Sequence, residues 1–234
     1  MHMNNVLPHI TLETGNSPQH SIIWLHGLGA DGEDFVPIAE EMNLPVAVRY
    51  IFPHAPMQPV TINGGFVMRA WYDIVASDID ARQDAAGIRA SQAYLEKLIA
   101  QEKRRGIAAE NIYLAGFSQG GVIALQTGLH HAERLGGILA LSTYLPLAET
   151  FADGASVCAK DTPIFMAHGR SDPVISYALG KISAEKLSGL GYPLEWHEYA
   201  MAHSVCMEEV RDIALWLTRR LNKSHLKMLR AQAG

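Results

Sequence analysis

Apolar runs of strand length alternate with amphipathic segments of helix length along almost the whole chain, and this alternation constrains the fold most. Near-continuous apolar strands separated by helices are typical of a parallel sheet with helices on both faces. Strands are expected at residues 21–26, 46–52, 111–116, 135–142, 163–168 and 194–199. Helices are expected at residues 34–42, 83–105, 119–129, 176–190 and 207–221. The sequence therefore predicts an α/β fold with a mostly parallel central sheet.

The length and the charge of the chain exclude several classes of protein. A chain of 234 residues can form one domain with a sizeable core. With 19 basic and 24 acidic residues the net charge is −5, which favours neither nucleic acid nor an anionic membrane as partner. No stretch approaches the ~18 consecutive apolar residues of a spanning helix, and the N-terminus lacks a signal-peptide pattern. We expect a single domain over residues 1–234, in a cytoplasmic protein without stable membrane insertion.

The cysteines give no sign of a disulfide framework or of a metal site. The chain has two cysteines, Cys158 and Cys206, and neither has the spacing of metal ligands. We expect two packed free thiols in a reducing compartment, and no metal or other cofactor.

Three segments fall outside the regular alternation. Residues 6–13 alternate weakly and are expected to form an edge hairpin with the first buried strand. Residues 54–80 are long and irregular, and a loop of this length in a compact domain is usually functional or disordered. The aromatic residues in it argue against disorder. The basic tail at residues 219–230 is expected to be a solvated helix end, because it also contains apolar residues.

The strand at 111–116 ends in the pentapeptide Gly116-Phe117-Ser118-Gln119-Gly120, and a helix follows directly. This is the G-x-S-x-G pattern of a nucleophile elbow, in the strand-turn-helix setting that the motif requires. The serine stands at the apex of a sharp turn, and the glycines let strand and helix approach where a Cβ atom would collide. The alternative is a tight turn with a solvated serine. The context favours Ser118 as a nucleophile.

A serine hydroxyl is a weak nucleophile at neutral pH and needs a base, which in turn needs an orienting group. In the fold class that carries this elbow, the chain order is serine, acid, histidine. His203 lies in a short loop before the last helix, at the carboxyl edge of the sheet, and is the expected base. Asp172 follows the fifth strand and is the expected acid, although an aspartate in this setting can also cap a turn. His168, at the end of that strand, is expected to be structural.

An oxyanion hole requires two converging N–H groups. One is expected from Gln119, at the start of the elbow helix. The other is expected from Leu28, in the glycine-rich loop 26–32 that follows the first buried strand. Such a loop can instead bind phosphate, but it does not match G-x-G-x-x-G and no P-loop lysine follows.

Further motifs accompany these residues in a fixed order along the chain. They are His26-Gly27-Leu28-Gly29-Ala30-Asp31-Gly32, Pro53-His54-Ala55-Pro56, the segments 59–64 and 70–73, Gly116 to Gly121, His168-Gly169, Asp172-Pro173-Val174, and Met201 with His203. From about residue 8 to 220 they resemble the carboxylesterase, lysophospholipase and acyl-protein thioesterase family, nearest to its bacterial carboxylesterases. The resemblance implies an α/β-hydrolase fold without a large cap domain. It also implies Ser118, Asp172 and His203 as a catalytic triad, with Leu28 and Gln119 as oxyanion donors.

We expect a serine esterase that hydrolyses carboxylic esters of short to medium acyl chains through an acyl-enzyme intermediate. An acyl-protein thioesterase or a lysophospholipase is the alternative with the same chemistry, and a binding protein on an inactive hydrolase fold is the alternative from another class. The expected partner is a small acyl ester or thioester, and a weak homodimer is compatible with the sequence. Trp71 and Val174 are expected to contact the acyl group. For Trp71, a place in the core is the competing interpretation.

Overall fold

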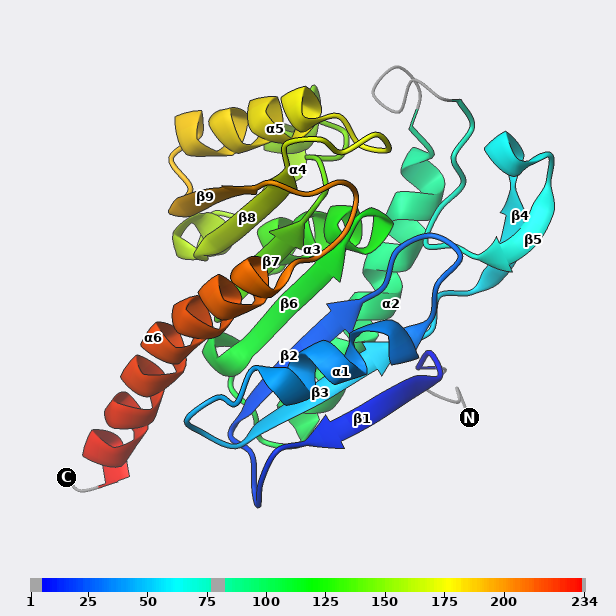
Figure 1. Cartoon of the computed structure of the whole chain (residues 1–234). Helices are drawn as coiled ribbons and strands as arrows, with labels where there is room; N and C mark the ends of the chain where they lie inside the picture. Colours follow the sequence, from blue (N-terminus) through cyan, green and yellow to red (C-terminus); the bar gives the residue numbers. More distant parts are fainter. Residues whose placement is uncertain (1–5, 77–82, 233–234) are drawn as a thin grey trace.

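The computed structural model describes residues 6–76 and 83–232, and within them the central sheet has the strand order β1-β3-β2-β6-β7-β8-β9 (Figure 1). The strands are β1 (His9–Glu13), β2 (His20–Leu25), β3 (Val48–Pro53), β6 (Ile112–Phe117), β7 (Gly137–Leu141), β8 (Ile164–Gly169) and β9 (Leu194–Tyr199). Every neighbouring pair is parallel except β1 and β3. The mostly parallel sheet predicted from the alternation is therefore confirmed.

The first strand pairs differently from the prediction. β1 lies antiparallel to β3, with Thr11 opposite Ile51, and not beside β2 as expected. The reason is that β2 already has parallel neighbours on both edges, β3 on one side and β6 on the other. After β2 the chain passes through α1 and returns as β3 beside β2. The free edge at this side of the sheet therefore belongs to β3.

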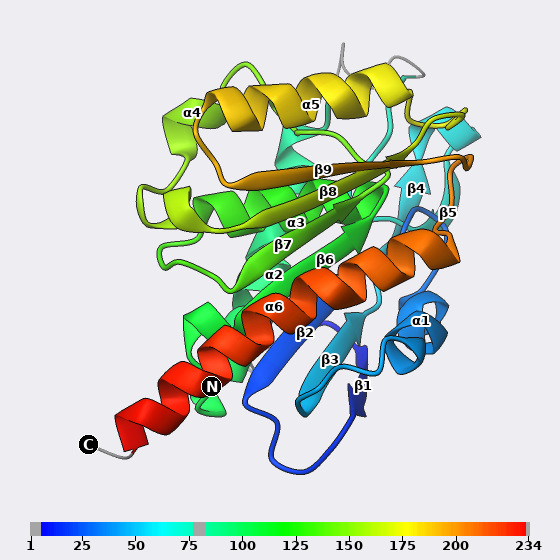
Figure 2. The same ribbon diagram turned by 60° about the vertical axis from the view of Figure 1, so that its left-hand side comes forward.

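Helices cover both faces of the sheet (Figures 1 and 2). They are α1 (Val36–Glu41), α2 (Ala85–Arg104), α3 (Gln119–His130), α4 (Phe151–Gly154), α5 (Tyr177–Gly189) and α6 (Met207–Gln232), with 3-10 turns at Gly32–Phe35, Thr61–Asn63, Ala109–Asn111 and Cys158–Asp161. One core cluster packs α2, α3 and α5 against the sheet, and a second packs α1 and α6 against the opposite face. Alternate residues of β2 supply the two cores: Ile23 lies in the first and Trp24 in the second.

Helix α6 continues well past the predicted end at residue 221, and Figure 2 shows it running beyond the edge of the sheet. The expected helical tail is thus part of α6. Its first basic residues are not simply solvated, because Arg219 and Arg220 both pair with Glu195 on β9, and Arg220 also stacks on Trp216. None of the helices in the described residues is long and apolar enough to cross a membrane.

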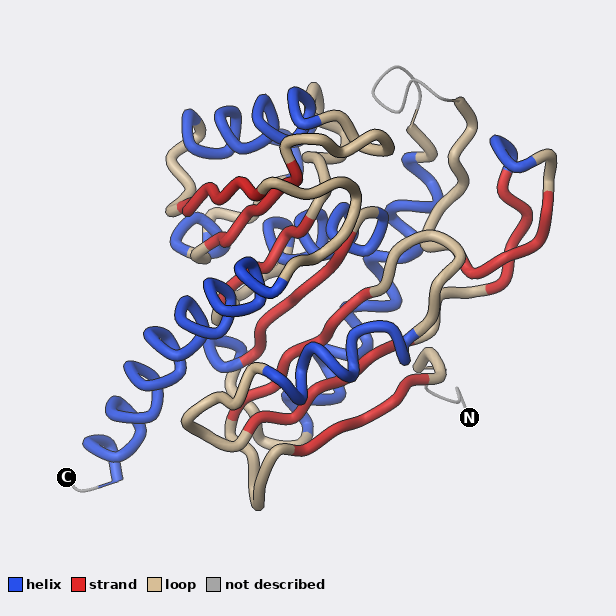
Figure 3. Tube along the Cα trace, viewed as in Figure 1, coloured by secondary structure: helices blue, strands red, loops and turns tan. Residues whose placement is uncertain are grey.

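The irregular segment contains a small sheet that the sequence analysis missed. β4 (Met57–Val60) and β5 (Phe66–Arg69) form an antiparallel pair, which Figure 3 shows standing apart from the central sheet. The turn between them uses Gly64 and Gly65, both with positive φ. Four residues per strand, with a proline in the first, give too short a pattern for recognition from sequence.

Candidate functional site

Ser118 stands between the end of β6 and the start of α3, at the carboxyl edge of the sheet. Its backbone has φ 55° and ψ −120°, a combination that non-glycine residues rarely adopt. The strain is held by the elements on both sides, since the Ser118 N–H donates to the Leu141 carbonyl at 2.9 Å and its carbonyl accepts from Thr143 Oγ1 at 2.8 Å. The residue is 8% exposed. The predicted turn is therefore present, with the strained serine that a nucleophile elbow needs.

The flanking glycines are required by direct backbone contact. A Cβ atom on Gly116 would lie 2.2 Å from the Gly120 carbonyl oxygen. A Cβ atom on Gly120 would lie 2.5 Å from the oxygen of Leu25 and 2.6 Å from that of His26, so α3 rests on the end of β2. Backbone atoms cannot yield as a flexible side chain can. The glycine spacing of the motif therefore has a steric cause in this chain.

Asp172 and His203 are brought together from the ends of β8 and β9. His203 Nδ1 donates to Asp172 Oδ2 at 2.7 Å, and the Asp172 side chain is fully buried. The other oxygen, Oδ1, accepts from the N–H groups of Val174 and Ile175 at 2.8 and 2.9 Å. Asp172 thus has both of the roles considered for it, turn acceptor and partner of the histidine. Because Nδ1 carries the proton, the His203 Nε2 atom is left as an acceptor.

His168 lies behind the aspartate. Its Nε2–H donates to the Ile175 carbonyl at 2.9 Å, and the same nitrogen lies 3.4 Å from Asp172 Oδ2. The ring is fully buried, and burial lowers its pKa, so it stays neutral and supports the Asp172 loop. The structural role expected for His168 agrees with this environment.

Ser118 and His203 line one cavity of about 520 Å³. The Phe117 ring forms part of the lining and lies between two others, with its centroid 4.7 Å from the His203 ring and 5.9 Å from the Phe35 ring. The sequence analysis had not assigned the wall formed by the 3-10 turn and α1, or the residues after His203. The lining consists of Gly27, Leu28, Ala30, Asp34, Phe35, Ile38, Phe117, Ser118, Val174, His203, Ser204 and Val205. The cavity is largely apolar, as ligand sites usually are.

Of the two expected oxyanion donors, Leu28 lines this cavity, whereas Gln119 follows Ser118 directly and is not among the lining residues. Gln119 is the first residue of α3, where backbone N–H groups have no acceptor within the helix. The Leu28 loop is held by His26, whose Nδ1–H donates to Gly27 and whose Nε2 accepts from Ala55. Burial lowers the pKa of His26 to about 4, so this neutral pairing is kept at physiological pH.

The expectation that Trp71 contacts the acyl group is wrong. Trp71 is 1% exposed, belongs to the core cluster that packs α2, α3 and α5 against the sheet, and is absent from the cavity lining, so it does not form an acyl wall. Its indole N–H donates to the His26 carbonyl at 2.9 Å. The Gln119 side chain, which sequence reasoning had not used, accepts from Trp71 N–H and donates to the Tyr72 carbonyl. Residues 48 positions apart make this contact, so no local pattern could reveal it.

Of the remaining predicted residues, Val174 lines the cavity and is 57% exposed, which suits a substrate contact. Both cysteines are free, as predicted, but Cys158 is exposed and Cys206 only half-buried, so the expectation of packed thiols was wrong for Cys158. Cys158 is the first residue of the 3-10 turn Cys158–Asp161, and its side chain is exposed to solvent there.

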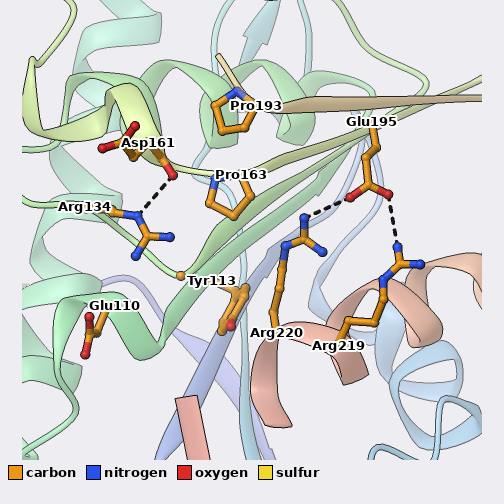
Figure 4. Close-up of a pocket in the computed structure, with 10 residues that line it drawn as sticks. Glu110, Tyr113, Arg134, Asp161, Pro163, Pro193, Glu195, Arg219 and Arg220 are labelled. Atoms are coloured by element: carbon orange, nitrogen blue, oxygen red, sulfur yellow. Dashed lines mark hydrogen bonds and ion pairs between the residues drawn. The ribbon is translucent and has the colours of Figure 1, made fainter. Parts of the chain in front are cut away.

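A second cavity of similar volume, also about 520 Å³, lies at the opposite edge of the sheet, before β6, β7, β8 and β9 (Figure 4). Its three arginines already have partners: Arg219 and Arg220 donate to Glu195 at 3.0 and 2.9 Å, and Arg134 donates to the Asp161 backbone carbonyl. Its described lining contains no serine, cysteine or histidine. Ligands of open α/β sheets bind at the carboxyl ends of the strands, so the cavity at Ser118 is the candidate site.

Comparison with known proteins agrees with this assignment. The family model for phospholipase/carboxylesterase matches residues 9–220. Acyl-protein thioesterase 1 of Neurospora crassa is 42% identical over 214 residues, covering 87% of each chain.

Solved structures resemble the whole fold as well. The crystal structure of Arabidopsis thaliana SOBER1 has a TM-score of 0.82 at 31% identity, covering 86% of this chain and 99% of the other. Zea mays acyl-protein thioesterase 2 also has a TM-score of 0.82, at 29% identity, covering 92% of this chain and 99% of the other. With the sequence match and the elbow geometry in agreement, the chain belongs to the phospholipase/carboxylesterase family and has its α/β-hydrolase fold.

Proposed function

We propose that this protein is a serine hydrolase that removes acyl groups from protein thiols, with Ser118 as nucleophile, His203 as general base and Asp172 as the group that orients the base. The observation that carries the proposal is the 2.7 Å hydrogen bond from His203 Nδ1 to Asp172 Oδ2, beside a serine in the strained elbow conformation. The name of the Neurospora crassa relative supports the thioesterase alternative more than the carboxylesterase first favoured from the sequence.

Acylation begins when Ser118 Oγ attacks the thioester carbonyl carbon while His203 Nε2 takes the hydroxyl proton. The negative charge that develops on the carbonyl oxygen is stabilised by the N–H groups of Leu28 and Gln119. The tetrahedral intermediate then breaks its C–S bond. The leaving sulfur takes the proton from His203, and the acyl group stays on Ser118 as an ester.

Deacylation repeats these steps with water as the nucleophile. Water gives a proton to His203 Nε2 and its oxygen attacks the acyl carbonyl, through an oxyanion held by the same two N–H groups. The Ser118–acyl bond breaks, the proton returns to Ser118 Oγ, and the carboxylic acid leaves. Throughout the cycle, Asp172 keeps the proton on His203 Nδ1, so that Nε2 faces the reacting atoms.

Hydrolysis of carboxylic esters is the second candidate function, because the family model that the chain matches is that of phospholipase/carboxylesterase. An ester and a thioester of the same acid pass through the same oxyanion at the same serine. We therefore expect both to be substrates, with the thioester as the physiological one.

The test compares Ser118→Ala with a matched serine variant, Ser171→Ala, on an S-octanoyl cysteine peptide. Ser171 lies at the same edge of the sheet, but its side chain is exposed and it is not in the cavity lining. Loss of the nucleophile costs roughly a millionfold in kcat in the best-studied serine hydrolase. We expect no measurable turnover by Ser118→Ala and ordinary turnover by Ser171→Ala. Turnover that survives in a folded Ser118→Ala protein would refute the proposal.

A further inference from the structure

One side chain gives the candidate active-site cavity an unexplained negative charge. Asp34, in the 3-10 turn that precedes α1, lines the same cavity as Ser118 and His203 and is exposed. Apart from Asp34 and His203, the lining residues are uncharged. A carboxylate here does not favour the binding of a hydrocarbon chain, because an apolar contact does not offset the free energy lost when the carboxylate is desolvated.

Asp34 has no ion-pair partner among the described residues. Partial burial and the neighbouring carboxylate of Asp31 both raise its pKa, and no cation is among the groups that act on it. Asp34 and Asp31 are thus two neighbouring carboxylates, neither with an ion pair in the described part of the chain, and the field of such a pair favours a positive group beside Asp34.

Asp34 is also not needed to start its own turn. Asp31 already has that role, since its Oδ1 accepts from the Glu33 N–H at 2.8 Å. Capping of the turn therefore explains why an aspartate stands at position 31, but not why one stands at position 34.

The position of Asp34 relates it to the leaving group. The Phe117 ring connects the turn to the base, because it lies against Phe35, the neighbour of Asp34, on one side and against His203 on the other. His203 must face the leaving sulfur to protonate it. The wall beside His203 and across Phe117 is therefore the place for the atoms attached to that sulfur.

We propose that Asp34 is a specificity residue that favours substrates with a positive charge close to the leaving sulfur, as in an S-acylated cysteine flanked by lysine or arginine. The inference rests on the proposed thioesterase function and adds to it a class of protein substrate: acylated cysteines in basic segments.

The sharpest test uses two substrates of equal shape and different charge. S-butyrylthiocholine carries a quaternary ammonium, and the S-butyryl ester of 3,3-dimethylbutane-1-thiol replaces its nitrogen by carbon. The quantity to measure is the ratio of kcat/KM for the cationic substrate to that for the neutral one. Asp34→Asn should lower this ratio about two- to five-fold, the effect of one exposed ion pair. Added salt should lower the ratio in the wild-type protein but change it little in Asp34→Asn.

Glu33→Gln is the matched control. It removes the same charge one residue away, from an exposed side chain that does not line the cavity, and we expect it to leave the ratio unchanged. An equal change in both variants, or none in Asp34→Asn, would overturn the inference. Hydrolysis of neither isostere would instead count against the proposed function itself, so the two failures are distinguishable.

A second arm uses acylated peptides with the residue after the cysteine as either lysine or N-acetyl-lysine. Acetylation removes the charge and keeps the stem. We expect wild-type protein to prefer the lysine peptide, and Asp34→Asn to lose this preference. If wild-type protein hydrolyses the two peptides equally, protein segments of basic character are not the selected class and the proposal falls.

Discussion

At the scale of single residues, the site depends on a strained serine between two crowded glycines. A non-glycine residue in such a conformation costs about 1–3 kcal/mol, so the surrounding contacts must hold it. Among these contacts is the close approach of Gly120 to the carbonyl oxygens at the end of β2, which leaves no room for a Cβ atom. The strain is useful because it lifts the Ser118 side chain out of the turn and towards the cavity that His203 also lines.

This packing predicts opposite effects for two glycine substitutions. Gly120→Ala should lower the free energy of unfolding by about 1–3 kcal/mol, the usual cost of overpacking, and should lower kcat because the elbow shifts. Gly189, the last residue of α5, has nothing within 4 Å of its virtual Cβ. Gly189→Ala should therefore raise stability by about 0.4–1 kcal/mol and leave kcat unchanged. Urea unfolding and thioester turnover measure both quantities. If Gly120→Ala were as stable and as active as the wild-type protein, the steric account would be wrong.

Sequence reasoning worked at this scale where chemistry requires a local pattern or a chain order. Ser118 was found from the pentapeptide, and Asp172 and His203 from their places after successive strands; the structure brings the last two into contact. Sequence reasoning did not reveal contacts between residues that lie far apart in the sequence. The Gln119 side chain meets the backbone of Trp71, and the large aromatic ring of Trp71 looks the same in sequence whether it lines a groove or fills a core.

At the scale of elements, strands and helices of the central sheet follow from hydrophobic periodicity, because burial on one or both faces dictates it. Pairing of the edge strand does not. β1 joins β3 because that edge is free, which is a property of the assembled sheet and not of residues 9–13. The β4–β5 pair was missed for a related reason: both strands are largely exposed, so they lack the apolar pattern that reveals a buried strand.

The first turn of α6 contains a buried acid that the mechanism does not use. Glu209 is fully buried, and burial raises its pKa to about 8, with a further increase from Asp212 and an opposing effect from the Cys206 backbone. In the unfolded chain a glutamate titrates near 4.3. The folded protein therefore binds the extra proton between these values. Its contribution to stability is complete below about pH 4.3 and is lost as the pH rises through about 8.

Glu209→Gln should remove this dependence, because glutamine is neutral at every pH and nearly isosteric. We expect the variant to unfold at a higher temperature than the wild-type protein at pH 8 to 9, with the difference shrinking towards pH 5. Glu208→Gln, at the exposed neighbouring position, is the control and should show no such trend. Thermal unfolding across this pH range measures the effect. A Glu209→Gln protein whose stability runs parallel to the wild type at all pH values would show that the acid is not held neutral.

At the scale of the whole molecule, the cavity is walled by short loops, the 3-10 turn and α1. In the described part of the chain, the long excursions from the α/β core are residues 54–76, with the small β4–β5 sheet, and residues 142–163, and neither range contributes a residue to the lining. A cavity without a cap domain above it binds an acyl chain on one side and leaves the other in water. Each CH₂ group then contributes less than the ~0.8 kcal/mol of full burial.

We therefore expect kcat/KM to rise modestly with acyl length and to level off at short to medium chains, for esters and thioesters alike. The measurement is a series of soluble p-nitrophenyl esters from acetate to decanoate, with matching thioesters, kept below the concentration of micelle formation. A steep rise that continues through the longest chain would indicate an enclosed tunnel and would contradict this description of the cavity.

The central claim is that the Ser118 Oγ atom, activated by His203, takes the acyl group. A fluorophosphonate tests it most directly, because it reacts with an activated serine far faster than with ordinary hydroxyl groups and forms an adduct that water does not remove. We predict one phosphonyl group per chain, located on the peptide that contains Ser118, with thioester hydrolysis lost in proportion to labelling and the substrate slowing the reaction. Thioester hydrolysis that continues in fully labelled protein, or a label at another residue with Ser118 unmodified, would contradict the account.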